Sequence, residues 1–363
     1  HHKGLEYDIE PYLKDSVTVE GSMDKHNRRY ALSGRSEYQE SFKVLQSEIE
    51  LPKMKFSKND YSYCKNKNIA EMLHTRMLFS CLVDADYSSS AEHYDNNYIS
   101  KSTGGLLKAD EILEKLHKYR ENIRKQSKSN KEINKIRDEL FNFCIEAAEK
   151  SPGLFTLTAP TGTGKTLSLL AFALAHAEKY KKKRIILVLP FLSIIEQNAQ
   201  IYREICGNIF EDHSQSEYDE ESRYYSERWD YPVIVTTSVK FFEALFKHQP
   251  VDCRKLHNIA NSVIVFDEAQ SLPPHLTGVT LDSINALCRK YNCSVVFSTA
   301  TQPSFKYRSD TEWKPVEIVY DPQKLYDGTR RVNVEWRIKE TTDLKKITQE
   351  MSKLNSCCTI VNM

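Results

Sequence analysis

The sequence predicts a multi-domain protein in which an all-α unit precedes an α/β unit built on a parallel sheet. The chain has 363 residues, which is long enough for more than one hydrophobic core. Apolar residues recur at helical spacing in residues 38–49 and 69–85, and strand signals are scarce before residue 107. From residue 153 onward, short apolar runs alternate with helix-forming runs, which indicates parallel strands covered by helices.

These patterns divide the chain into successive segments. In order, they are an all-α unit at 1–107, a helical linker at 108–150, a first α/β domain at 151–325 and the start of a second α/β domain at 326–363. Two polar stretches are predicted to lack regular structure. Residues 86–104 read as a loop that leaves the all-α unit, and the acidic, tyrosine-rich residues 211–230 read as a mobile excursion between strands.

The first α/β domain takes its predicted strands from apolar, β-prone runs at residues 153–158, 184–189, 233–237, 263–266 and 294–298. Helices are predicted between them, at residues 167–177, from 194 onward and at 239–246. The second domain is predicted to have strands at 332–336 and 357–361 around a helix at 344–354.

Composition places the chain among soluble cytoplasmic proteins. Hydrophobic residues make up 40% and charged residues 28%, and no apolar stretch is long enough to cross a bilayer, so we expect no membrane partner. The nine cysteines form no CxxC pair, which predicts reduced, buried thiols. A net charge of +1 says nothing about nucleic acid, because local grooves can be basic in a neutral protein.

Residues 159–166 predict a phosphate-binding loop between a strand and a helix. Glycines at alternate positions let the loop curl so that backbone N–H groups point at phosphate oxygens, the lysine neutralises the outer phosphates, and the last threonine offers its hydroxyl to Mg²⁺. We therefore expect ATP and Mg²⁺ as cofactors, bound by Thr161, Gly162, Thr163, Gly164, Lys165 and Thr166.

Asp267 and Glu268 follow a buried strand, at the sheet edge where ligands of open α/β folds collect. The order of the two motifs predicts that Asp267 holds Mg²⁺ and that Glu268 orients the attacking water and accepts its proton. Lys165, Asp267 and Glu268 are the predicted catalytic residues. Thr299 and Thr301, at the end of the next strand, offer hydroxyls that could relay the state of the γ-phosphate.

This series of motifs resembles superfamily 2 helicases of the DExH kind, over residues 155–303. The resemblance implies RecA-like lobes, with residues 326–363 beginning the second. It rests on the phosphate loop, Leu189-Pro190-Phe191-Leu192-Ser193, Val235-Thr236-Thr237, Asp267-Glu268-Ala269-Gln270 and Thr299-Ala300-Thr301. In that family the second and third segments contact the backbone of a single strand, which implies contacts to DNA or RNA phosphates by Ser193 and Thr237.

Residues 1–107 resemble the C-terminal part of an HD-type metal phosphohydrolase. Two strings resemble those of the helicase-nucleases of type I CRISPR systems. They are His1-His2-Lys3-Gly4, with its adjacent histidines, and Phe79-Ser80-Cys81-Leu82-Val83-Asp84-Ala85-Asp86. The resemblance implies that His1, His2 and Asp86 hold Mn, Fe, Ni or Co for phosphodiester cleavage, with Asp84 a weaker candidate. A purification-tag remnant is the other reading of the histidines.

The resemblance implies an ATP-dependent translocase on single-stranded DNA, coupled to a metal-dependent nuclease and recruited by a guide-RNA surveillance complex. The earlier HD ligands and the later helicase segments do not occur in these 363 residues, so we expect little activity from them alone. Two alternatives stay open: a DExH RNA helicase without nuclease, and a docking module without turnover. Subtype, nuclease metal, direction of movement and oligomeric state are not specified, and Asn134 and Arg137 are both open for adenine recognition.

Overall fold

The computed structural model describes residues 67–98, 103–126, 131–216, 218, 220–272, 276–330, 332, 343–354 and 356–358. The described residues up to Gly328 form one compact unit, and those from Thr329 onward belong to a second, smaller unit. The predicted helix at 38–49 and the residues His1 and His2 lie outside the described part of the chain. The larger unit contains the predicted first α/β domain at 151–325.

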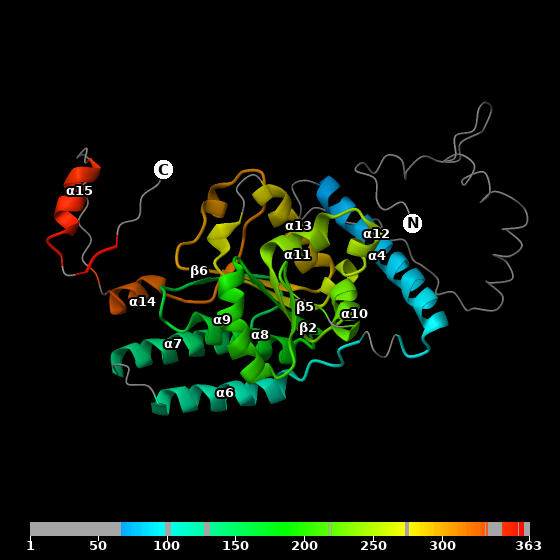
Figure 1. The fold of residues 1–363 in the computed structure, drawn as a ribbon, viewed down its shortest axis with the longest axis horizontal. Helices are drawn as coiled ribbons and strands as arrows, with labels where there is room; N and C mark the ends of the chain where they lie inside the picture. The colour runs from blue at the N-terminus through cyan, green and yellow to red at the C-terminus, as the bar shows by residue number, and fades with distance from the viewer. Residues whose placement is uncertain are drawn as a thin grey trace, which may run out of the picture. The chain divides into compact units, whose positions relative to one another are not determined.

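A parallel sheet forms the centre of the larger unit (Figure 1). Its strands lie in the order β3-β4-β2-β5-β6-β1-β7. Their bounds are Leu154–Thr158 for β1, Arg184–Leu189 for β2, Phe210–Asp212 for β3, Val233–Thr237 for β4, Ser262–Phe266 for β5, Ser294–Thr299 for β6 and Val316–Glu317 for β7. The parallel, helix-covered sheet predicted from the sequence is confirmed, while the short edge strands β3 and β7 were not predicted.

Helices cover both faces of the sheet. Alternate residues of β2 show the two faces, because Leu187 belongs to one hydrophobic core and Ile186 to the other. One core is covered by α6 (Ala109–Gln126), α7 (Lys131–Ala147), α8 (Lys165–Lys179) and α9 (Leu192–Cys206). The other is covered by α4 (Lys67–Tyr94), α11 (Ser238–Phe246), α12 (Pro250–Cys253) and α13 (Thr277–Lys290). Figure 1 shows α6, α7 and α8 on one side of the sheet and α11 and α13 on the other.

The predicted loop at 86–104 is wrong at its start, because α4 continues as far as Tyr94. Polar side chains four residues apart anchor this helix to the rest of the unit, and such spacing places them on one face. Arg76 donates to Leu245 O at 2.6 Å, and Ser80 donates to Cys253 O at 2.5 Å. Asp84, four residues after Ser80, forms buried ion pairs with Arg228 and Arg254. One face of this helix therefore packs through polar contacts, which hydrophobic periodicity alone does not reveal.

The predicted mobile excursion at 211–230 is also wrong, because it contains β3 and α10 (Glu220–Arg228) and packs against the sheet. Trp229 is fully buried, and its indole donates to Asp212 at 2.6 Å. Burial would raise the pKa of Asp212, but Lys255 at 2.9 Å, together with hydrogen bonds from Trp229 and Tyr218, holds it below its usual value. One buried carboxylate thus gathers donors from three parts of the chain.

The smaller unit contains α15 (Leu344–Met351), which confirms the helix predicted at 344–354. Of its two predicted strands, the described positions Val332, Cys357 and Cys358 are not in strands, and the others lie outside the described residues. Cys357, Cys358 and Cys81 are exposed, so the prediction of buried thiols is wrong for these three. No helix among the described residues is long and apolar enough to cross a membrane.

Among the described residues, short 3-10 helices also connect elements of the larger unit. They are the 3-10 helices η1 (Leu256–Ile259), η2 (Ala269–Ser271) and η4 (Ser304–Tyr307). The last helix of this unit is α14 (Pro322–Gly328), which packs on α7. η2 follows the predicted catalytic carboxylates directly, so the chain turns sharply away from the sheet at that point.

Candidate nucleotide-binding and catalytic site

The predicted phosphate loop joins β1 to α8, as a phosphate cradle requires. Gly162 and Gly164 have left-handed backbones, with φ of +83° and +82°, a conformation that residues with a Cβ rarely adopt. Thr163 is buried and its hydroxyl donates to Pro160 O at 2.8 Å, which fixes the curl of the loop from inside. Lys165 is the first residue of α8, so the loop ends at a helix N-terminus, which favours anions.

Lys165 lies largely buried in the pocket. Its side chain is 10% exposed, and its Nζ lies 3.6 Å from Glu268 Oε1. Among the described residues, Nζ has no hydrogen-bond acceptor. A buried ammonium retains hydrogen-bonding capacity that phosphate oxygens can use, since a cation is costly to bury without partners. This orphaned donor fits the phosphate role predicted from the sequence.

Asp267 stands at the carboxyl end of β5. Its backbone N–H donates to Val188 O at 3.0 Å, and its carboxylate accepts hydrogen bonds from Ser298 Oγ at 3.1 Å and from the Glu268 N–H at 3.0 Å. Burial raises the pKa of Asp267, Lys165 opposes this rise and Glu268 adds to it. Asp267 and Thr166 both line the pocket, and their oxygen atoms are the kind of donor that Mg²⁺ prefers.

Glu268 has a left-handed backbone, with φ of +51°, where the chain leaves β5 for η2. Its Oε2 accepts from Gln270 Nε2 at 2.7 Å. The other end of that amide accepts from the Thr299 hydroxyl, and the Thr301 N–H donates to Thr299 Oγ1 at 3.0 Å. Thr299 and Thr301, predicted to sense the γ-phosphate, are therefore linked to Glu268 through Gln270, a residue for which no role was predicted.

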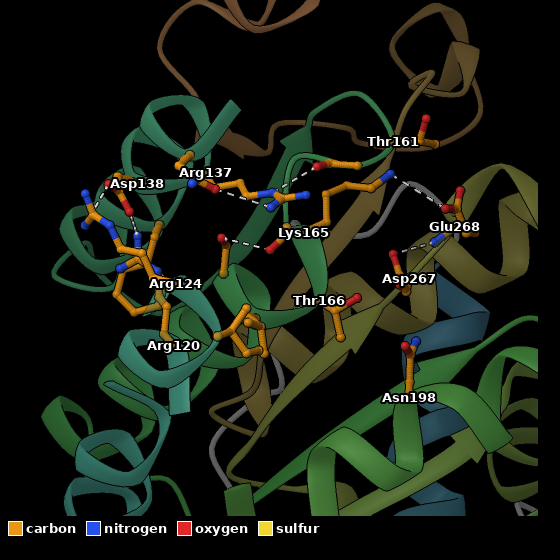
Figure 2. Close-up of a pocket in the computed structure, with 17 residues that line it drawn as sticks. Arg120, Arg124, Arg137, Asp138, Thr161, Lys165, Thr166, Asn198, Asp267 and Glu268 are labelled. Atoms are coloured by element: carbon orange, nitrogen blue, oxygen red, sulfur yellow. Dashed lines mark hydrogen bonds and ion pairs between the residues drawn. The ribbon is translucent and has the colours of Figure 1, made fainter. Parts of the chain in front are cut away.

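The phosphate loop, the two carboxylates and helices α6 and α7 surround one cavity of 540 Å³. Figure 2 shows Lys165 directed toward Glu268, while Arg120, Arg124 and Asp138 gather at the opposite end. Arg124 pairs with Asp138 at 3.2 Å. These residues of the helical linker were not predicted to belong to the site, because only the folded chain brings them to the same cavity as the phosphate loop.

Both residues left open for adenine recognition line the same cavity. Arg137 donates from Nε to Gly162 O at 3.3 Å, which connects α7 to the phosphate loop. Its Nη1 lies 3.5 Å from Asn134 Oδ1. The helical linker is thus a wall of the cavity that contains the phosphate loop.

Ser193 and Thr237, the predicted strand contacts, follow neighbouring strands. Ser193 lies in the first turn of α9, after β2. Thr237 ends β4 and caps α11, since its hydroxyl accepts from the Lys240 N–H at 3.2 Å. Because β2 and β4 are adjacent, both positions lie on the edge that carries Asp267. Their contact with nucleic acid stays a prediction.

The nuclease centre is not assembled within the described residues. Asp86 is half-buried on α4, and the described part of the chain contains no group of three or more side chains arranged to hold a metal ion. Its weaker alternative, Asp84, accepts from Arg228 and Arg254 at 3.0 Å each. Those ion pairs give Asp84 a structural role, and the assignment of Asp86 stays a prediction.

Comparison with known proteins agrees with this geometry. The sequence model of the DEAD/DEAH box helicase family matches residues 115–308. A curated relative, the CRISPR-associated nuclease/helicase Cas3 of Haloferax volcanii, is 27% identical over 185 residues, which is 43% of this chain and 20% of that protein. The chain therefore spans about a fifth of the length of this relative. The resemblance predicted from the sequence, to CRISPR helicase-nucleases, is confirmed for a helicase fragment of this type.

Solved helicase structures are also similar. The crystal structure of T. fusca Cas3 with ADP matches with 20% identity and a TM-score of 0.38, covering 48% of this chain and 21% of that one. The Hef helicase domain of Pyrococcus furiosus matches with 19% identity and a TM-score of 0.34, covering 53% of this chain and 34% of that one.

Proposed function

The chain belongs to the DEAD/DEAH box helicase family, whose match covers residues 115–308, and we propose that it uses ATP hydrolysis to move along single-stranded DNA. The observation that carries this proposal is the meeting of the phosphate loop and both carboxylates in one cavity, with Lys165 Nζ 3.6 Å from Glu268 Oε1. DNA rather than RNA is proposed from the resemblance of the sequence to the helicase-nucleases of type I CRISPR systems.

Hydrolysis follows from the placement of these side chains. Lys165 neutralises the β- and γ-phosphates, and Thr166 and Asp267 would hold Mg²⁺, which neutralises phosphate charge when it is bound. Glu268 orients the attacking water and accepts its proton. Ser298 and the Glu268 N–H fix the Asp267 carboxylate, so its orientation does not depend on the nucleotide.

Coupling to movement is proposed through the link from Glu268 to Thr299. Gln270 contacts both residues, so a change at the carboxylate reaches the loop after β6. Ser193 and Thr237, at the ends of neighbouring strands, would hold the phosphates of the DNA strand. The same edge of the sheet would then hydrolyse ATP near Glu268 and bind the DNA strand near Ser193 and Thr237.

The second part of the proposal is a nuclease. Residues 1–107 would be the C-terminal part of an HD-type domain in which His1, His2 and Asp86 hold Mn, Fe, Ni or Co, and residues 326–363 would begin the second helicase lobe. Residues 108–150 would link the nuclease to the first lobe, at 151–325. The complete protein would be recruited, in the cytoplasm of a prokaryote, by a guide-RNA surveillance complex of a type I CRISPR system, which supplies sequence specificity.

The experiment is degradation of circular single-stranded DNA by the intact parent protein in Mn²⁺ or Ni²⁺, with and without ATP. Asp86→Ala should abolish cutting, since it removes a proposed metal ligand. Lys165→Ala should still cut without ATP, because it removes only phosphate binding. Circular DNA is used so that cutting does not require a free end.

The outcomes separate the two parts of the proposal. Cutting by the wild type and by Lys165→Ala, but not by Asp86→Ala, supports both assignments. If no metal supports cutting while strand-stimulated ATP hydrolysis persists, the nuclease proposal is wrong and a helicase without nuclease remains. If neither activity is found, the chain is better described as a docking module.

A further inference from the structure

We infer that α14 carries the state of the ATPase centre to the second unit, and that Tyr326 is the positioning residue that ties this helix to the catalytic loop. This inference rests on the proposed function and deepens it, because it names the element through which ATP hydrolysis reaches the next part of the chain.

The first attachment is to the loop after β6. The Tyr326 hydroxyl donates a hydrogen bond to Ala300 O. Ala300 lies between Thr299 and Thr301, and Thr299 is joined through Gln270 to Glu268. A continuous series of hydrogen bonds and one short loop therefore leads from the catalytic carboxylate to α14.

The Tyr326 hydroxyl is suited to act as a fixed donor. The side chain is half-buried, and burial raises the pKa of Tyr326, with Glu317 adding to the rise. The hydroxyl therefore stays protonated at neutral pH, and a backbone carbonyl is an acceptor that cannot titrate. This contact holds through the ATPase cycle unless the loop itself moves.

The second attachment is to α7. Lys324 Nζ pairs with Glu139 Oε1 at 2.5 Å, and Leu325 is buried in the core that α7 also covers. At the end of the helix, a Cβ placed on Gly328 would lie 2.9 Å from Ile136 Cδ1, so the Ile136 side chain of α7 packs directly against the Gly328 backbone. The contact between these helices is therefore close along most of α14.

α7 is also a wall of the nucleotide cavity. Arg137, one residue after Ile136, donates to Gly162 O in the phosphate loop. Movement of that loop on nucleotide binding would reach α14 through α7, and movement of the Thr299 loop would reach it through Tyr326. The helix thus contacts elements from both sides of the nucleotide.

The position of α14 in the chain gives these contacts their consequence. The helix ends at Gly328, and the second unit begins at Thr329. A helix held by two groups of contacts that respond to nucleotide, directly before a unit boundary, can pass a small displacement to the residues that follow, since packed elements shift between discrete arrangements.

The test compares Tyr326→Phe with Tyr320→Phe in protein that carries both helicase lobes. Tyr320 is 95% exposed, so Tyr320→Phe is the matched control that also removes one tyrosine hydroxyl. ATP hydrolysis is measured without nucleic acid and with a poly-dT strand, together with translocation rate and thermal unfolding. We expect Tyr326→Phe to keep the basal rate and to lose about five-fold of the dT-stimulated rate, the effect of one hydrogen bond.

Each result supports or overturns the inference. An unchanged ratio of stimulated to basal rate in Tyr326→Phe overturns it. A fall of both rates in equal proportion, with a lower melting temperature, also overturns it, because the hydroxyl would then act on stability alone. A wild type whose ATP hydrolysis the strand does not stimulate overturns the proposed function, and this inference with it. If the strand stimulates hydrolysis by the wild type and by Tyr320→Phe, but much less by Tyr326→Phe, the result supports both.

Discussion

The Lys165 ammonium and the Glu268 carboxylate lie 3.6 Å apart, at the ends of two strands separated in the sheet by β6. Lys165 enters the cavity from the first turn of α8, after β1, and Glu268 from the turn that follows β5. The proposed phosphate-binding cation and the proposed base therefore share one side of the pocket. Because one is a cation and the other a base, substitutions of Lys165 and Glu268 should affect nucleotide binding and the rate of hydrolysis separately.

Lys165→Ala should lose nucleotide binding, whereas Glu268→Gln should keep it and lower the rate of hydrolysis by a factor of about 10² to 10⁴. The lysine acts on bound phosphates, and the carboxylate acts on the proton of the attacking water. Titration with a fluorescent ATP analogue and steady-state hydrolysis measure the two quantities. Glu268→Gln with a normal turnover rate would remove Glu268 from the mechanism.

Gly164→Ala should weaken nucleotide binding and lower the melting temperature. With φ of +82°, an alanine there costs about 1 to 2 kcal/mol, and its Cβ would lie 3.6 Å from the Arg137 side chain. Gly153→Ala is the matched control, because its Cβ meets no atom within 4 Å. Isothermal titration and thermal unfolding check both variants, and equal behaviour of the two would contradict a strained loop.

Asp84→Ala should destabilise the protein by about 3 to 5 kcal/mol, because it leaves the buried guanidinium of Arg254 without its carboxylate. Arg228 and His257, at 3.0 and 3.7 Å, lose the same partner. Urea unfolding measures the difference. Asp86→Ala, two residues along the same helix, should change stability far less while abolishing metal-dependent cutting. If Asp86→Ala were the more destabilising of the two, the roles given to these aspartates would be reversed.

His176 should make stability depend on pH. It is fully buried, with Nδ1–H donating to Ala148 O at 2.9 Å and Nε2 accepting from Ser294 Oγ at 2.7 Å. Burial lowers its pKa to about 4, and Lys182 and Lys179 act in the same direction while the Ala148 contact opposes it.

The sign follows from the unfolded chain, where the pKa of a histidine is about 6.5. Between about pH 6.5 and pH 4 the unfolded state binds the extra proton, so stability falls as pH falls through that window, by at most roughly 3 kcal/mol, and changes no further below it. His176→Phe should flatten this part of the curve of unfolding free energy against pH. If the unfolding free energy of His176→Phe changed as steeply with pH as that of the wild type, the pH dependence would come from another group.

The candidate catalytic site could be located from the sequence because its signals are local. Lys165 and Thr166 follow glycines that only a special loop requires, and Asp267 and Glu268 follow directly on a buried strand. Apolar runs of the sheet carry the same kind of local signal. Such patterns specify backbone and residue type together, so the strands and the phosphate loop agree with the structure.

Other features depend on contacts between distant segments, which no local pattern records. Gln270 reaches Thr299, and Tyr326 reaches Ala300, only after the sheet has assembled. The acidic stretch at 211–230 reads as mobile, yet Trp229 and the charges around Asp212 pack it firmly. Polar composition predicts mobility only where the polar groups lack partners in the folded protein.

The most direct test of the central claim is steady-state ATP hydrolysis in Mg²⁺, titrated with single-stranded DNA and, separately, with single-stranded RNA, in protein that carries both lobes. We expect hydrolysis that DNA stimulates more than RNA and that Glu268→Gln removes. Hydrolysis that neither strand stimulates, or that persists unchanged in Glu268→Gln, would contradict it.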